Sequence, residues 1–329
     1  MKTPKYWRKN NSLISIILIP LSYIWFLALK FKLFINSPKK TDIPLICIGN
    51  VTAGGAGKTP VTIALAKILI KKGLKAHILS HGYGGSQKTS TKVNENIHNV
   101  EKVGDEAILC SRIAPTWISK NKYKGVKNII LAGAQIIITD DGFQNNKINK
   151  NFSFLVLDGS TGLGNNRIIP AGPLRESLNH AIKRANAVII VNKDHQGLTT
   201  LIPKHTPVIA SQIKVNNKSK KYLYKKSVIG FTGIGYPEKF LETIKNEGAI
   251  VKKFHIFGDH HNFTNIELEK LFKQAQQLKA TCVTTSKDYV RIPKLYRDNV
   301  REICVTLEFK NTKKLENLLK EIIEEKNYA

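Results

Sequence analysis

A glycine-rich turn between an apolar strand and a helix constrains this chain more than any other feature. The apolar run Ile43 to Ile48 leads into residues 49–60, which read Gly-Asn-Val-Thr-Ala-Gly-Gly-Ala-Gly-Lys-Thr-Pro. In such a loop the backbone N–H groups surround a phosphate, the lysine reaches its outer oxygens, and the threonine hydroxyl contacts Mg²⁺. We therefore expect a nucleoside triphosphate site. The residues expected to form it are Thr52, Ala53, Gly54, Gly55, Ala56, Gly57, Lys58 and Thr59.

The charge of the chain indicates which partners to expect. Its 329 residues include 52 Lys and Arg against 24 Asp and Glu, a formal net charge of +28, which favours phospholipid or a phosphorylated substrate. Lysine is abundant throughout, and we find no dense basic block with interleaved aromatic residues, so nucleic acid is not expected as a partner. The four cysteines are far apart and form no CxxC pair, which predicts reduced thiols.

The N-terminal region predicts contact with a membrane. Residues 11–29 carry no charged side chain and would make a helix about 28 Å long, which is just enough to cross a bilayer core. Pro20 lies in the middle and lysines flank both ends, so a helix lying in the interface is as consistent with the pattern as one that spans the membrane. We expect residues 1–40 to form a membrane-associated segment on the cytoplasmic side.

Alternating apolar runs and helical stretches predict an α/β fold with a mostly parallel sheet and helices on both faces. A lysine-rich stretch after the first block suggests a boundary near residue 213, with a core domain at 41–212 and a smaller α/β domain at 213–329. The strands expected in the core are Ile43–Ile48, Ala76–Ser80, Ile136–Thr139, Phe154–Asp158, Ala187–Val191 and Val208–Ala210.

Two aspartates follow one of these strands directly. Ile136 to Thr139 runs into Asp140, Asp141, Gly142, Phe143 and Gln144, and open α/β sheets bind ligands at the carboxyl ends of their strands. Combined with the loop upstream, the pair predicts a magnesium site formed by Thr59, Asp140 and Asp141.

Two further places offer acid–base groups. Gly104-Asp105-Glu106 precedes an apolar helical segment, so these carboxylates could simply cap that helix. Alternatively, Asp105 accepts a proton from an attacking hydroxyl, and His260 in Gly258-Asp259-His260-His261 orients or shares that proton. Two adjacent histidines could also bind a metal, but we favour one catalytic histidine.

Several of these motifs together resemble the tetraacyldisaccharide 4'-kinase family, the lipid A 4'-kinases of Gram-negative bacteria. The loop at residues 49–60 resembles that family's variant P-loop, with Thr52 in place of the usual glycine. The order of the other motifs is also similar, and His81 stands where the family usually has arginine. These motifs are Asp140-Asp-Gly-Phe-Gln144, Pro170-Ala-Gly-Pro-Leu-Arg-Glu176, Phe231-Thr-Gly-Ile-Gly235 and Asp259-His260.

The resemblance implies two α/β domains joined by a hinge, and a membrane-associated monomer that transfers the γ-phosphate of ATP, with Mg²⁺, to the 4'-hydroxyl of an acylated glucosamine disaccharide 1-phosphate. It implies a catalytic dyad of Asp105 and His260, supported by Lys58 and Asp141. It also implies that Glu106, Gln144, Arg175 and Glu176 lie near the metal or the substrate. A membrane-bound P-loop ATPase that acts on a protein partner remains the alternative.

Overall fold

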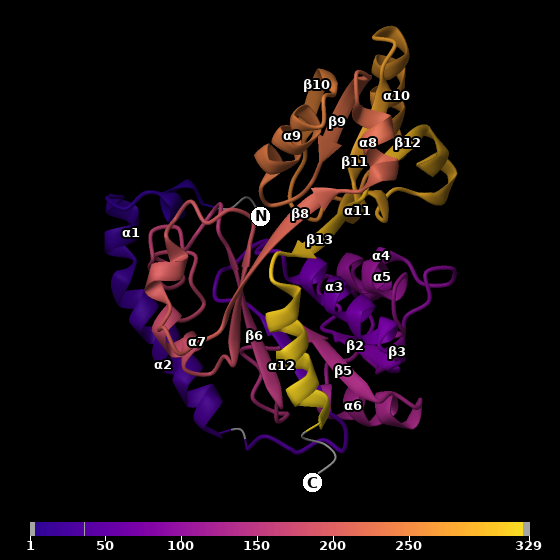
Figure 1. Cartoon of the computed structure of the whole chain (residues 1–329). Coiled ribbons are helices and arrows are strands. Elements are labelled where there is room, and N and C mark those ends of the chain that lie inside the picture. Colours follow the sequence, from indigo (N-terminus) through magenta and orange to yellow (C-terminus); the bar gives the residue numbers. More distant parts are fainter. Residues whose placement is uncertain (1–3, 36, 325–329) are drawn as a thin grey trace.

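A mostly parallel sheet forms the larger part of the computed structural model, which describes residues 4–35 and 37–324 (Figure 1). Within that range it has nine strands in the order β13-β8-β7-β6-β1-β5-β2-β4-β3. Adjacent strands are parallel except for β13 with β8 and β3 with β4. The strands are β1 Leu45–Gly49, β2 Ala76–Ser80, β3 Thr91–Lys92, β4 Thr116–Ile118, β5 Ile136–Asp140, β6 Phe152–Asp158, β7 Ala187–Val191, β8 Val208–Val215 and β13 Val305–Phe309.

Helices cover both faces of this first sheet, so its central strands β1, β2, β5, β6 and β7 are buried at every position and mostly apolar. Ile46 and Ile48 of β1 pack on the face covered by α3 and α12, whereas Leu45 and Cys47 pack on the opposite face. This confirms the predicted α/β fold. The helices of this part are α3 Lys58–Lys71, α4 Val100–Val103, α5 Asp105–Ser111, α6 Lys122–Leu131, α7 Leu178–Ile182, the 3-10 helix η2 Leu198–Leu201, and α12 Thr312–Glu324.

A second, four-stranded sheet lies beyond the end of β8 (Figure 1). Its order is β10-β9-β11-β12, and all three strand pairs are parallel. Helix α10 covers one face, and α8 and α9 cover the other. Its elements are α8 Asn217–Leu223, β9 Ser227–Thr232, α9 Pro237–Asn246, β10 Ile250–Ile256, α10 Asn265–Gln277, β11 Thr281–Thr285, α11 Ser286–Tyr289, η3 Lys294–Asn299 and β12 Val300–Ile303.

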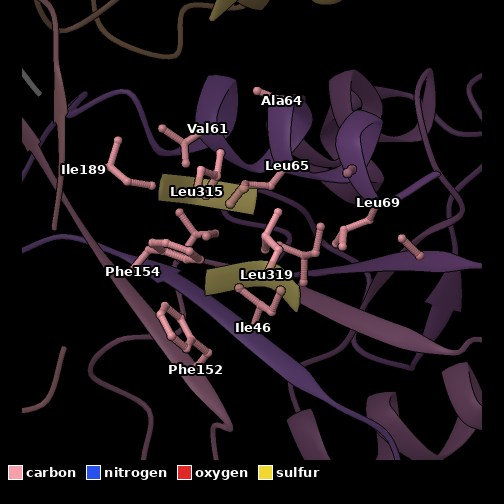
Figure 2. Close-up of a cluster of buried hydrophobic side chains, with 14 of the residues drawn as sticks. Ile46, Val61, Ala64, Leu65, Leu69, Phe152, Phe154, Ile189, Leu315 and Leu319 are labelled. Carbon is pink, nitrogen blue, oxygen red and sulfur yellow. The ribbon is translucent and has the colours of Figure 1, made fainter. Parts of the chain in front are cut away.

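The end of the chain returns to the first sheet, which corrects the predicted domain division. The boundary at 212/213 falls inside β8, and β13, predicted to lie in the second domain, pairs with β8 from Val305–Val215 to Phe309–Ser211. Leu315 and Leu319 of α12 are fully buried beside α3 and Phe154 (Figure 2). The prediction was wrong because it followed chain order, whereas the amphipathic helix buries its apolar stripe on the first sheet.

The N-terminal segment runs along the side of the first sheet as η1 Lys5–Arg8, α1 Leu13–Ile17 and α2 Ile19–Ile35 (Figure 1). Among the described residues no helix combines the length and the apolar character needed to cross a membrane. Residues 1–3 and 36 of the predicted membrane-associated segment lie outside the described residues, as do residues 325–329 at the other end.

Serines attach this apolar segment to the protein. Ser15 donates to the Ala171 carbonyl at 2.6 Å and is itself approached by Arg167 at 2.8 Å, while Ser22 donates to the Ile168 carbonyl at 2.8 Å. Most of the large apolar side chains of α1 and α2 face away from these contacts and are exposed, including Leu13, Ile17, Tyr23, Leu27 and Phe31. The polar residues therefore face inwards and the apolar face points outwards, the reverse of an ordinary surface helix.

Candidate functional site

The phosphate-binding loop lies between β1 and α3, as predicted. Gly54 and Gly57 have positive φ angles of 115° and 84°, a conformation that glycine adopts without strain. The buried Asn50 donates to the Thr52 carbonyl at 2.7 Å, and Ala53 N–H donates to the Pro173 carbonyl at 2.7 Å. The first part of the loop is therefore attached to the 170–176 motif, and the N–H of Ala53 is already engaged there.

Thr59 and Asp140 meet at the start of α3. The Thr59 hydroxyl donates to Asp140 Oδ2 at 3.1 Å, and Thr62 approaches Asp140 Oδ1 at 3.4 Å. Burial raises the pKa of Asp140 to about 6, and the charges of Asp141 and Glu106 add to this effect against the opposing charge of Lys58.

These groups fit Mg²⁺, a hard cation that usually keeps several waters and takes one or two protein carboxylates. A hydroxyl and a carboxylate oxygen already lie together at this point. The described residues contain no cluster of three or more His, Cys, Asp or Glu side chains arranged to hold a metal. A larger cage is not needed where phosphate oxygens and water complete the coordination.

Asp141 lies in an ion-pair network at the mouth of the loop, with a left-handed φ of 59°. Arg175 donates to its two carboxylate oxygens at 3.0 and 3.1 Å, and Lys58 Nζ lies 3.6 Å away. Burial raises the pKa of Asp141, but Lys58 and Arg175 outweigh it and leave the pKa below its ordinary value. Lys58 also donates to Asn50 at 3.1 Å, and burial lowers its own pKa.

The predicted Glu176 is fully buried and is bound by other side chains. It pairs with Arg184 and with His180 Nδ1 at 2.8 Å, and Gln144 donates to it at 3.2 Å. Gln144 also donates to the Asn50 carbonyl at 2.8 Å, which connects this cluster to the loop. Glu176 thus anchors the segment that carries Arg175.

Asp105 and His260, far apart in sequence, are brought together by the two sheets. Asp105 begins α5 on the first sheet, and His260 lies in the loop after β10 of the second sheet. The distance from His260 Nδ1 to Asp105 Oδ2 is 3.5 Å. Burial raises the pKa of Asp105, but a hydrogen bond with the Glu106 side chain and the charges of Lys287 and Arg291 lower it overall. Burial, together with Lys287 and Arg291, lowers the pKa of His260, which favours the neutral imidazole.

The neighbouring His261 has a different environment. Its ring stacks on Phe257, contacts Phe263, and bonds to Glu267 at 2.9 Å, all within the second sheet's own layer. The two histidines point apart, and His260 sits in a turn with a left-handed φ of 60°.

A hollow of about 400 Å³ lies beside the phosphate-binding loop. The phosphate-binding loop, the segment after β6 and the start of α9 form its walls, with Arg8 4.6 Å above the Tyr236 ring. Lys239 pairs with Asp158 beside it and links the two sheets.

Sequence reasoning missed the cations that surround the candidate base. Lys287 and Arg291 follow β11, and Lys287 lies 2.6 Å from Glu106. A further missed cation, Lys122, belongs to the other end of the site: it is buried against the Ser80 carbonyl at 2.8 Å, and burial lowers its pKa to about 8 against the opposing charges of Asp140 and Asp141. The position of Lys287 and Arg291 just after a buried strand was a usable signal, since strand ends of this kind also carry the phosphate-binding loop and Asp140.

Comparison with known proteins decides the family. The family model described as tetraacyldisaccharide-1-P 4'-kinase matches residues 14–324. The chain belongs to this family. The sequence-based recognition is thereby confirmed, and with it the predicted class of enzyme, an ATP-dependent kinase of lipid A biosynthesis.

Relatives of this kinase family match the chain over almost its whole length. A tetraacyldisaccharide 4'-kinase of Paramagnetospirillum magneticum is 42% identical over 310 residues, covering 94% of this chain and 95% of the relative. That of Rhodospirillum centenum is 38% identical over 331 residues, covering 99% and 98%. The crystal structure of LpxK from Aquifex aeolicus in complex with ATP has a TM-score of 0.78 at 26% identity and covers 94% of this chain and 100% of that one.

Proposed function

We propose that this chain transfers the γ-phosphate of ATP to the 4'-hydroxyl of a tetraacylated glucosamine disaccharide 1-phosphate. The observation that carries the proposal is the meeting of Asp105 with His260 close to the ionic network of Lys58 and Asp141. Lys58 and Asp141 suit a phosphate donor, and Asp105 with His260 suits a hydroxyl acceptor. The Aquifex aeolicus relative, described in complex with ATP, supports the choice of donor.

The phosphate-binding loop supplies the donor site. The N–H groups around Gly55 and Gly57 and the ammonium of Lys58 bind the β- and γ-phosphates, and the nucleoside occupies the hollow beside Tyr236. Thr59 and Asp140 would hold Mg²⁺, with Asp141 beside them. When bound, the cation neutralises charge that develops on the phosphate oxygens.

Asp105 accepts the proton of the 4'-hydroxyl. Its pKa is lowered, so the carboxylate is ionised at neutral pH and needs no prior loss of a proton. Transfer is in line, and positioning by the two sheets supplies much of the rate. The two sheets close on the substrates by bending at β8 and β13. Both catalytic groups come from one chain, which supports a monomer.

The N-terminal segment supports a site at the membrane surface. Its exposed apolar face suits the acyl chains of the inner membrane, with Tyr23 near the headgroups. Lys5 and Lys9 precede this face and suit anionic phospholipid. The catalytic groups then lie on the cytoplasmic side, where ATP is available.

The test is transfer of radiolabel from γ-labelled ATP, in Mg²⁺ and detergent, to the tetraacylated disaccharide 1-phosphate. A matched acceptor lacks the 4'-hydroxyl, and the Lys58→Ala variant controls for contaminating kinases. Label on the first lipid alone is expected. Free phosphate released equally with or without lipid would instead establish the alternative, an ATPase acting on a protein partner.

A further inference from the structure

We propose that Arg291 is a positioning residue of the kinase reaction, which holds Asp105 ionised and His260 in one tautomer. The inference rests on the proposed function, in which Asp105 is the base. It turns the Asp105–His260 pair into a three-part unit whose middle member is a guanidinium from the second sheet.

The backbone that carries Arg291 is rigidly held. Asp288, three residues earlier and fully buried, accepts from the hydroxyls of Thr232 at 2.6 Å and Thr285 at 2.7 Å and from Gly233 N–H at 3.0 Å. Arg291 N–H then donates to the Asp288 carbonyl at 2.9 Å. Arg291 Nη1 also lies 3.6 Å from Asp288 Oδ1, so the carboxyl ends of β9 and β11 hold the guanidinium as well as the backbone that carries it.

The guanidinium lies between the two predicted catalytic groups. Its Nη2 donates to Asp105 Oδ2 and lies 2.8 Å from His260 Nδ1. Arginine has donors only, so Nδ1 must accept this hydrogen bond and cannot carry a proton. The imidazole is therefore neutral with its proton on Nε2, and Nδ1 has no hydrogen to donate to Asp105.

Burial strengthens the effect of this charge on Asp105. The side chains of Arg291 and Asp105 are each only 1% exposed, and an opposite charge in contact favours the ionised carboxylate most where water is excluded. Asp105 Oδ1 accepts from Glu106 N–H at 3.0 Å. Three other charged groups face the Asp105–His260 pair. Lys287 lies 3.9 Å from Asp105, Glu106 is its neighbour in the chain, and Asp259 lies 3.8 Å from His260 Nε2. The titratable Tyr83 ring lies 5.5 Å from the His260 ring.

A purely structural ion pair is the competing explanation, and the chain offers a matched control for it. Arg112 of the first sheet's layer bonds to Glu302 of β12 at 3.1 Å and to Glu95 at 2.9 Å. It also joins the two sheets through an arginine–carboxylate pair but touches neither Asp105 nor His260. Loss of Arg112 removes a link between the sheets and leaves the charge next to Asp105 unchanged.

The experiment measures kcat/KM for lipid phosphorylation against pH in the full-length Arg291→Met, Arg291→Lys and Arg112→Met variants. Removing the positive charge raises the pKa of Asp105, so the acid limb of the Arg291→Met profile should move upward by about one unit or more. Below the shifted limb, each unit lowers kcat/KM by about tenfold. Arg291→Lys should restore most of the limb's position, and Arg112→Met should leave it where it is.

An unshifted acid limb in both Arg291 variants would overturn the proposal, as would equal shifts in Arg291→Met and Arg112→Met. If Arg291→Met does not fold, as judged by its thermal transition, Arg291→Gln takes its place, because glutamine also removes the positive charge, and an unshifted acid limb in that variant would overturn the proposal. Asp105→Asn separates the two levels of inference. If Asp105→Asn keeps its turnover, Asp105 is not the base. If Asp105→Asn loses its turnover but the Arg291 variants show unshifted pH profiles, only the role of Arg291 is refuted.

Discussion

Replacing Leu319 by alanine tests whether α12 is part of the first sheet's core. Leu319 is fully buried and packs between α3 and Phe154 (Figure 2). Loss of three carbons removes about 2.4 kcal/mol at 0.8 kcal/mol per buried CH₂. The cavity left behind brings the expected loss in the free energy of unfolding to about 3–5 kcal/mol.

Leu318→Ala is the matched control, because this neighbour in the same helix is only partly buried. The same exchange in the same helix has the same helix propensity, so the difference between the two variants reports burial. The three tryptophans, Trp7, Trp25 and Trp117, all belong to the first sheet and its N-terminal segment, so their fluorescence in urea follows that part selectively. Equal losses in the two variants, or lost hydrogen-exchange protection in β9 and β11 but not in α3, would refute the placement of α12.

Three further predictions concern the site and its support. Asp105→Ala should lower kcat about 10²- to 10⁴-fold while ATP binding, followed by titration calorimetry, stays intact; comparable kcat would remove Asp105 as the base. Lys58→Ala should weaken ATP binding about 10- to 100-fold, the worth of a charge-assisted hydrogen bond, and unchanged affinity in the same titration would exclude Lys58 from the phosphate site. Ser15→Ala removes the acceptor of Arg167 Nη1, at about 1–3 kcal/mol, whereas Asn165 keeps its bonds to the Tyr6 and Ala171 carbonyls, and it should speed hydrogen exchange at residues 165–171; unchanged exchange there would show that Ser15 does not hold the N-terminal segment in place.

Much of the first sheet could be predicted because its central strands are buried on both faces. Such strands read as continuous apolar runs, and Ala76–Ser80 and Ala187–Val191 were predicted with the bounds that the structure shows. The phosphate-binding loop and Asp140 were found for a related reason. Both lie where a buried strand ends, and polar residues at that point stand out from the sequence.

The remainder depends on contacts that leave no local pattern. Among the described strands, the edge strand β13 pairs with the antiparallel β8 alone, and its alternation of exposed and buried residues is short. The position of Arg291 between Asp105 and His260 arises from three loops on two sheets, and no spacing in the sequence encodes it. Glu176 was expected near the metal, and only the fold shows that Arg184 and His180 occupy its oxygens.

The return of β13 and α12 to the first sheet has a consequence for biosynthesis. Ribosomes add about 5–20 residues per second, so the stretch between Val215 and Val305 separates the two halves of this core by roughly 5–20 s. During that interval the edge of β8 lacks its pairing strand β13, and the α3 cluster lacks the leucines of α12 that pack against it. The nascent polypeptide thus carries its exposed nucleotide-binding half until the last helix emerges, and this is the period in which chaperones would be needed most.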